Sequence, residues 1–400
     1  MKKVWDLIDK YKMQIFFVIF ALLAVIIRVF FLESQSGDYN TYLKPWFDKL
    51  LADKGLLGIA NYDGNYNMPY VIILAILTYL PIDSLISIKV VSIFFDFVCA
   101  TFGALIVREI ITDKNKTLFS FLIFISILFL PTVVLNSAGW AQSDSIYAAF
   151  MLISLFFLVK EKYIKSFIFL GIAFAFKLQF IFILPVYILV YISKRNFPIW
   201  YFLFIPITEF IMCLPSILLG APINSFITVY TDQASEYVDY VVLNLPNIHT
   251  LLFYNDSLLV VSPAEYIPKT STLITIVIFI ISAFIILYKK VKLNKVRIIE
   301  FALWSILVSC FFLPHMHERY LYAADIISII YFAITKKNIY IPLSVNLISF
   351  ISYANYLYGA VPIPFSYVAI FYLAIIIKFT KDIFKPIFVE KVKENKTVNI

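Results

Sequence analysis

The chain has 400 residues, of which 62% are hydrophobic and only 14% are charged, and its mean hydropathy is +0.91. Soluble domains contain roughly 45–50% apolar and about 25% charged residues, so this composition excludes an ordinary soluble fold and indicates a protein embedded in a bilayer. The net charge of +8 would suit a nucleic-acid partner, but the basic residues lie in short clusters between apolar runs. Such clusters are typical of topology signals, and no nucleic acid is expected to bind.

In chain order, the apolar runs predict about twelve transmembrane helices in one membrane-embedded domain, 1–400. The first run is too long for the core of a signal peptide and has no small-residue cleavage site. Lys177 separates two of the runs, which predicts two short helices meeting at a break. The runs are 14–32, 85–107, 118–135, 143–159, 166–176, 178–193, 199–219, 271–288, 299–313, 319–335, 339–356 and 363–380.

The segment Met68 to Ile82 is apolar but has only about 15 residues, fewer than a span normally needs. If it does not cross, 25 of the 33 basic residues fall on one side of the membrane, which the positive-inside rule assigns to the cytoplasm. We therefore expect a re-entrant or surface helix at 68–82. Both termini are then cytoplasmic in a multi-pass plasma-membrane protein.

This topology leaves two long outer loops, 33–84 and 220–270, and a basic cytoplasmic tail, 381–400. Function is expected on the outer face, because every cytoplasmic connection is short. Acidic and aromatic residues gather in the first outer loop. Within it, the run Asn40 to Leu51 repeats apolar residues at spacings of 3, 4 and 7, which predicts an amphipathic helix lying on the membrane.

Ionisable groups in or beside a span cost at least about 2.5 kcal/mol each on insertion scales, so they are candidates for function. Five places qualify: Asp38, Asp96, Asp144, Lys177 and the run 315–319. All except Asp96 are expected near the outer boundary.

The late run His315-Met316-His317-Glu318-Arg319-Tyr320 combines three titratable residue types. Arg319 offers a planar set of donors that suits phosphate, and the two histidines can donate hydrogen bonds or carry a proton. An anionic phosphate headgroup is the expected ligand. One alternative is zinc, because His-x-His recurs in metal sites, although no third ligand is evident. Another is a cluster that only anchors a helix end.

Asp38 follows the first span and is a candidate to accept a proton from an acceptor hydroxyl. Asp144 opens an apolar helix a few residues after Trp140 and Gln142, which suit a sugar ring by stacking and hydrogen bonding. For both aspartates, the alternative is a helix N-cap.

Lys177, with Gln179 two residues on, lies in the middle of 28 mostly apolar residues. It is expected to meet an anion, such as a phosphate that Arg319 also binds. The alternative is a lysine that extends its ammonium group to the membrane surface.

Four elements in this order resemble the GT-C superfamily of membrane glycosyltransferases over most of the chain. They are a Gly-Asp-Tyr turn after the first span, a Trp-x-Gln-Ser-Asp element, a lysine at a helix break and a late Met-His-Glu-Arg-Tyr. The chain looks most similar to bacterial relatives of the GPI mannosyltransferases. The dolichyl-phosphate glucose and mannose transferases resemble it more distantly.

The resemblance implies an inverting hexosyltransferase that takes its sugar from a polyprenyl-phosphate donor and passes it to a cell-envelope glycan or lipid acceptor. Asp38 matches the catalytic carboxylate, and Lys177 and Asp144 match positions that line the cavity. Residues matching the donor-contacting late motif are His315, His317, Glu318 and Arg319. Further candidates for substrate contact are Tyr39, Trp140, Gln142, Gln179 and Tyr320.

Some GT-C members use a divalent cation and others use none, and the sequence leaves both open while naming no metal ligand. Two departures from relatives lie on the acceptor side: Ala141 stands where Gly is frequent, and Asn67-Met68-Pro69 replaces Tyr-Pro-Pro. No Gly-rich phosphate loop is present, in keeping with a lipid-linked rather than a nucleotide-linked donor.

Two other functions remain open. A transporter or lipid-linked glycan flippase would also have about twelve helices, but such proteins usually show two related halves with midplane charges. A polysaccharide polymerase or ligase would share the outward-facing site and a long late outer loop such as 220–270.

Overall fold

The computed structural model describes residues 2–112, 114–236, 240–252, 258–260, 266–359 and 363–397. Within these ranges nearly everything is helical, and the short strands β1 (Tyr240–Leu243), β2 (Leu258–Val260) and β3 (Met316–His317) form one small sheet. The all-α class is therefore confirmed. Parts of the predicted loop 220–270 and the last three residues of the predicted tail 381–400 lie outside the described residues.

Every apolar run singled out in the sequence contains a helix. They are α1 (Lys2–Val29), α4 (Ser84–Ile110), α5 (Lys116–Leu128) with α6 (Pro131–Val134) and η3 (Leu135–Gly139), α7 (Asp144–Val159), α8 (Tyr163–Phe176), η4 (Leu178–Ile183) with α9 (Leu184–Lys194), η5 (Ile199–Leu203) with α10 (Phe204–Leu218), α13 (Tyr266–Tyr288), α14 (Lys295–Phe312), α15 (Tyr322–Thr335), α16 (Tyr340–Tyr358) and α17 (Phe365–Thr397).

Four helices in the described part are long and apolar enough to cross a membrane, or five if the bent pair 116–128 and 131–139 counts as one span. Others are short: α8 and α15 have 14 residues each, or about 21 Å, against a hydrocarbon core of about 30 Å. The figure of twelve spans therefore stays a prediction.

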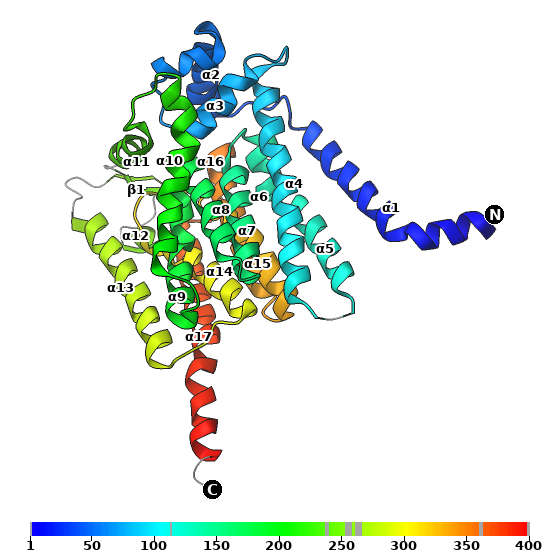
Figure 1. Cartoon of the computed structure of the whole chain (residues 1–400), viewed down its shortest axis with the longest axis vertical. Helices are drawn as coiled ribbons and strands as arrows, with labels where there is room; N and C mark the ends of the chain where they lie inside the picture. Colours follow the sequence, from blue (N-terminus) through cyan, green and yellow to red (C-terminus); the bar gives the residue numbers. More distant parts are fainter. Residues whose placement is uncertain are drawn as a thin grey trace.

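Some helices are buried on nearly all sides, among them α7 and the 18-residue α14, and others expose apolar side chains. α7 is buried along most of its length and packs against α4 and α8, whereas large apolar side chains of α1, α10 and α13 are exposed, for example Phe16, Ile211 and Ile280. In Figure 1 the N-terminal end of α1 points away from the bundle, whereas Phe17 and Phe20 farther along α1 contact Phe121 of α5. Exposed apolar faces of this extent suit contact with lipid.

The region after α1 folds into η1 (Tyr39–Leu43), α2 (Lys44–Ala52), η2 (Gly55–Asn61) and α3 (Met68–Leu77). The predicted amphipathic helix forms, but Leu43, Phe47 and Leu50 are buried in the protein's own core. The expectation that this apolar side rests on the membrane is therefore wrong. α3 has 10 residues, or about 15 Å, a length that agrees with keeping 68–82 out of the spans.

The predicted helix break at Lys177 is confirmed. α8 ends at Phe176, Lys177 has extended backbone angles of φ −153° and ψ 142°, and η4 begins at Leu178. The break turns the lysine side chain inward, toward α7.

Candidate functional site

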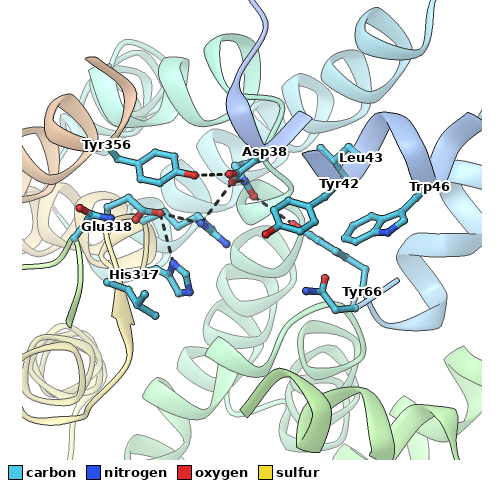
Figure 2. A pocket seen from close by; sticks show the side chains of 13 residues that line it. Asp38, Tyr42, Leu43, Trp46, Tyr66, His317, Glu318 and Tyr356 are labelled. Carbon is cyan, nitrogen blue, oxygen red and sulfur yellow. Dashed lines mark hydrogen bonds and ion pairs between the residues drawn. The ribbon is translucent and has the colours of Figure 1, made fainter. Parts of the chain in front are cut away.

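A polar cavity of about 290 Å³ lies beside α2 and brings together residues that are far apart in the chain. Figure 2 shows Tyr42 and Trp46 on one side of it, Tyr356, Glu318 and His317 on the other, and Asp38 between them. The remaining lining residues are Leu43, Asn65, Tyr66, Gln142, Leu243, Asn244 and Arg319.

Asp38 is held by side chains rather than by a helix terminus. Its Oδ2 accepts hydrogen bonds from Gln142 Nε2 at 2.6 Å and from Trp140 Nε1 at 3.1 Å, and its Oδ1 accepts one from the Tyr356 hydroxyl. Asp38 makes no capping bond, and Ser36 Oγ accepts the Tyr39 amide instead. Asp38 therefore meets two residues that were expected to contact a sugar, and the N-cap alternative for Asp38 fails. Gln142 lines the cavity, but Trp140 is fully buried and stacks on Tyr356. The sugar-stacking role expected for Trp140 is therefore wrong.

Asp144 and Lys177 form a buried ion pair behind the cavity. Lys177 Nζ donates to Asp144 Oδ1 at 2.7 Å, and Asn136 Nδ2 donates to Asp144 Oδ2 at 2.9 Å. Asp144 is fully buried and Lys177 is 8% exposed. The alternative of a helix N-cap for Asp144 and that of a lysine reaching the membrane surface for Lys177 therefore both fail. A buried charge needs a partner, and each residue supplies the other's.

A phosphate was expected to bind between Lys177 and Arg319, and the ion pair between Lys177 and Asp144 contradicts that expectation. Arg319 Nε lies 3.6 Å from Asp144 Oδ2, so a carboxylate already occupies the space between the two cations. Lys177 lines neither this cavity nor the apolar groove described below. Its contribution reaches the cavity through Asp144.

Arg319 joins three carboxylates around the cavity. Its Nη1 lies 2.9 Å from Glu318 Oε1 and 3.9 Å from Asp38 Oδ2, and its guanidinium lies 5.6 Å from the Trp140 ring centroid. Burial works to raise the pKa of Glu318, but the hydrogen bond with His317 and the charge of Arg319 hold that pKa below its usual value. Burial also lowers the pKa of His317, which favours the neutral imidazole at pH 7. These contacts are not those of a surface anchor.

The late run is shaped by a segment of the second long loop. β1 pairs with β3 in parallel, with Val242 opposite Met316 and Leu243 opposite His317, and the His315 amide donates to Val241 O at 3.0 Å. His315 itself has φ +60°, a left-handed conformation uncommon for a residue with a side chain. The sequence did not predict β1, because four residues give little periodic signal.

An apolar groove of about 800 Å³ adjoins the cavity. α13 and η4 supply most of its walls, with side chains such as Leu273, Ile276 and Ile181. Its polar residues are Gln179, Gln233, Lys269, Thr272, His315, His317 and Tyr320. Among the residues that line the two spaces, His317 is common to both.

Tyr39 does not reach either space. It is 3% exposed and its hydroxyl shares a hydrogen bond of 2.7 Å with Ser84 Oγ, so it joins η1 to α4. The substrate-contact role expected for it is wrong, because the short turn after Asp38 points the next side chain into the protein.

Several lining residues were not predicted. Tyr356 is separated from Asp38 by 318 positions, and Asn244 lies in the poorly patterned second loop. Tyr42, Trp46 and Tyr66 belong to the aromatic-rich first loop, which was the one available signal. Two single π-helical turns, η1 and η3, flank the site, and such turns are frequent near functional sites.

Among the described side chains, no group of three or more His, Cys, Asp and Glu residues is arranged to hold a metal ion. The zinc alternative for His315 and His317 therefore gains no further ligand there. The two histidines also differ in surroundings, since only His317 reaches the polar cavity.

No protein-family model matches the chain, and no curated protein is similar enough to count as a match. The fold and site define a helical protein with membrane-compatible helices and a charged, aromatic-lined cavity.

His249 is expected to make the free energy of unfolding depend on pH. It lies in α12 (Ile248–Leu252), is fully buried, and neither ring nitrogen has a hydrogen-bond partner in the described part. Burial, with a smaller effect of His315, lowers its pKa to about 4. An unfolded histidine has a pKa of about 6.5, so below that pH the unfolded state binds the extra proton more readily.

We therefore expect a stability contribution of about 3 kcal/mol that is complete above pH 6.5 and is lost as the pH falls toward 4. His249→Leu should flatten the dependence of the unfolding temperature on pH in that window, measured on purified protein in detergent. An unchanged pH dependence would show that other groups control acid unfolding.

Proposed function

We propose that this protein is an inverting glycosyltransferase that transfers a hexose from a polyprenyl-phosphate donor to a hydroxyl of a cell-envelope glycan or lipid, on the outer face of the plasma membrane. The supporting observation is that a polar cavity containing Asp38 and an apolar groove adjoin at His317. A lipid-linked sugar needs such a pair of spaces, one for the chain and one for the sugar.

The groove suits a polyprenyl chain because one of its walls faces the surroundings of the bundle. Leu273 is 60% and Ile276 48% exposed, and both belong to α13, one of the helices apolar enough to span a membrane. Lys269, at the start of that helix, and His315 line the groove together with His317. They are suited to contact a phosphate whose lipid chain lies along Leu273 and Ile276.

The chemistry follows from where the charges lie. Asp38 takes the proton of the acceptor hydroxyl, whose oxygen forms a bond to the anomeric carbon from the face opposite the phosphate. The bond from that carbon to the phosphate oxygen breaks, and polyprenyl phosphate leaves with the electron pair. Hydrogen bonds from Arg319 and His317 stabilise the charge that develops on the leaving oxygen.

Lys177 acts on this reaction only indirectly, because its charge is paired with the carboxylate of Asp144. Asp38, Asp144 and Glu318 carry three negative charges, and Arg319 and Lys177 carry two positive ones. An incoming phosphate therefore gains little from Lys177, and the groove residues Lys269 and His315 are better placed to contact it.

Trp46 is expected to bind the acceptor. Its ring lies 5.7 Å from that of Tyr42 and 5.5 Å from that of Tyr66, so the three form an aromatic wall on which a sugar ring can pack. Trp46→Ala should raise the acceptor KM about tenfold, the equivalent of about 1.4 kcal/mol, and leave the donor KM unchanged. Trp200→Ala, at an exposed tryptophan of η5, is the matched control. A rise in the donor KM instead would move the aromatic wall to the donor side.

The function is tested by supplying polyprenyl-phosphate mannose, glucose, galactose or N-acetylglucosamine to membranes that contain the protein. One donor should release polyprenyl phosphate in step with the glycosylated product. Release of polyprenyl diphosphate from a lipid-linked oligosaccharide would indicate a polymerase or ligase. Movement of lipid-linked glycan across the membrane without bond cleavage would indicate a flippase. Either result would overturn the proposal.

A further inference from the structure

Lys89 of α4 is fully buried and binds main-chain oxygens at the end of α1. Its Nζ donates to the carbonyls of Phe31 at 2.7 Å, Leu32 at 3.1 Å and Ser34 at 2.5 Å. These carbonyls belong to the turn that follows α1, whose last residue is Val29, and a cation just beyond a helix C-terminus faces the negative end of the helix dipole. Lys89 therefore ties the turn that leads to Asp38 onto α4.

Asp96 lies two helical turns farther along the same face of α4, since residues seven apart share a face. It is fully buried, and its Oδ2 accepts from Arg28 Nε of α1 at 2.9 Å and from Ser137 Oγ of η3 at 2.6 Å. One face of α4 thus holds both α1 and η3, which lead to Asp38 and to Trp140 respectively.

The two tied segments also bind each other immediately before the site. Ser34 Oγ donates to Gly139 O at 2.9 Å, and Ser36 Oγ donates to Trp140 O at 2.8 Å. Two residues beyond Ser36, Asp38 accepts its bonds from Trp140 and Gln142. A change in the distance between the two segments would therefore lengthen or break the hydrogen bonds that Asp38 accepts from Trp140 and Gln142.

We propose that Lys89 and Asp96 are positioning residues that hold Asp38 against Trp140 and Gln142 in the geometry needed for transfer. This inference rests on the proposed function. Neither residue lines the polar cavity or the groove, so each acts on the reaction through the segments that it binds.

The test compares Lys89→Met with Lys89→Arg and with Lys44→Met. Methionine keeps the length and apolar bulk of Lys89 but donates no hydrogen bond, whereas arginine can restore the donors. Lys44 is an exposed lysine at the start of α2, paired with Asp48, and serves as the control. Initial rates give kcat and both KM values. Hydrogen exchange followed by mass spectrometry reports segments 30–43 and 135–143 without reference to activity.

For Lys89→Met we expect kcat to fall about 10- to 100-fold, because a displacement of about 1 Å can cost that much. The donor KM should stay within about twofold, both segments should exchange faster, and Lys89→Arg should recover part of kcat. Asp96→Asn should accelerate exchange in 135–143 and lower kcat in the same way.

Unchanged exchange in both segments of Lys89→Met, or a loss of kcat that equals the loss of folded protein, would overturn the inference. If the unaltered protein transfers no sugar from any of the four donors, the proposed function fails instead. The exchange measurements then decide on their own whether Lys89 holds the turn after α1 onto α4.

Discussion

Replacing Asp38 with Asn is expected to lower kcat by about 10²- to 10⁴-fold, the usual contribution of a general base. Asparagine has the same shape, and its carbonyl oxygen can keep the bonds from Gln142 and Trp140. Its amide nitrogen would then face the Tyr356 hydroxyl, which can turn to accept. The fold should therefore persist while the proton acceptor is lost.

The measurement is the initial rate of transfer by purified protein, with the unfolding temperature followed in parallel. Asp48→Asn is the matched control: this carboxylate is exposed, belongs to the same first loop and pairs with Lys44. Retention of near-normal kcat in Asp38→Asn would remove Asp38 from the role of base and leave it as a residue that orients Trp140 and Gln142.

Arg319→Lys is expected to raise the donor KM about tenfold, close to 1.4 kcal/mol, with a smaller effect on the acceptor KM. Lysine keeps the positive charge among the buried carboxylates but loses the planar fork that can bind Glu318 and a phosphate together. Binding of the donor should suffer most, because its phosphate carries the charge that the fork recognises.

Arg319→Ala should weaken donor binding further and also reduce stability. Removing one partner from a buried ionic cluster costs about 3–5 kcal/mol, and both Glu318 and Asp144 are fully buried. For this reason the lysine variant is the cleaner test, and Arg195→Lys, at an exposed arginine after α9, is its control. Equal effects on the donor and acceptor KM values would contradict the assignment of Arg319 to the donor phosphate.

Local patterns in the sequence predicted the helices well, because hydropathy and helix breaks are properties of neighbouring residues. The break at Lys177 and the helix over 40–51 followed from one interrupted run and one repeated spacing. Whether the helix over 40–51 packs against lipid or against the protein core could not be predicted from the sequence. An apolar stripe on a helix can pack against lipid or against a protein core, so periodicity alone does not predict which of the two it contacts.

The ionisable residues singled out in the sequence lie close together in the structure, but their individual partners could not be predicted. Asp38, Asp144, Lys177 and Arg319 were singled out because ionisable groups beside apolar runs are expensive to bury. That Lys177 pairs with Asp144, and that Tyr356 donates to Asp38, depended on how separate helices meet.

By itself, the sequence determined that this is a helical protein suited to a membrane, with its ionisable groups at a few places, because composition and hydropathy act locally along the chain. Only the tertiary structure decided which of those groups meet. It placed β1 beside the late run, put the groove next to the cavity at His317, and made one face of α4 the support for both segments that carry the site. Such contacts join residues dozens to hundreds of positions apart, and they arise from packing that no local pattern encodes.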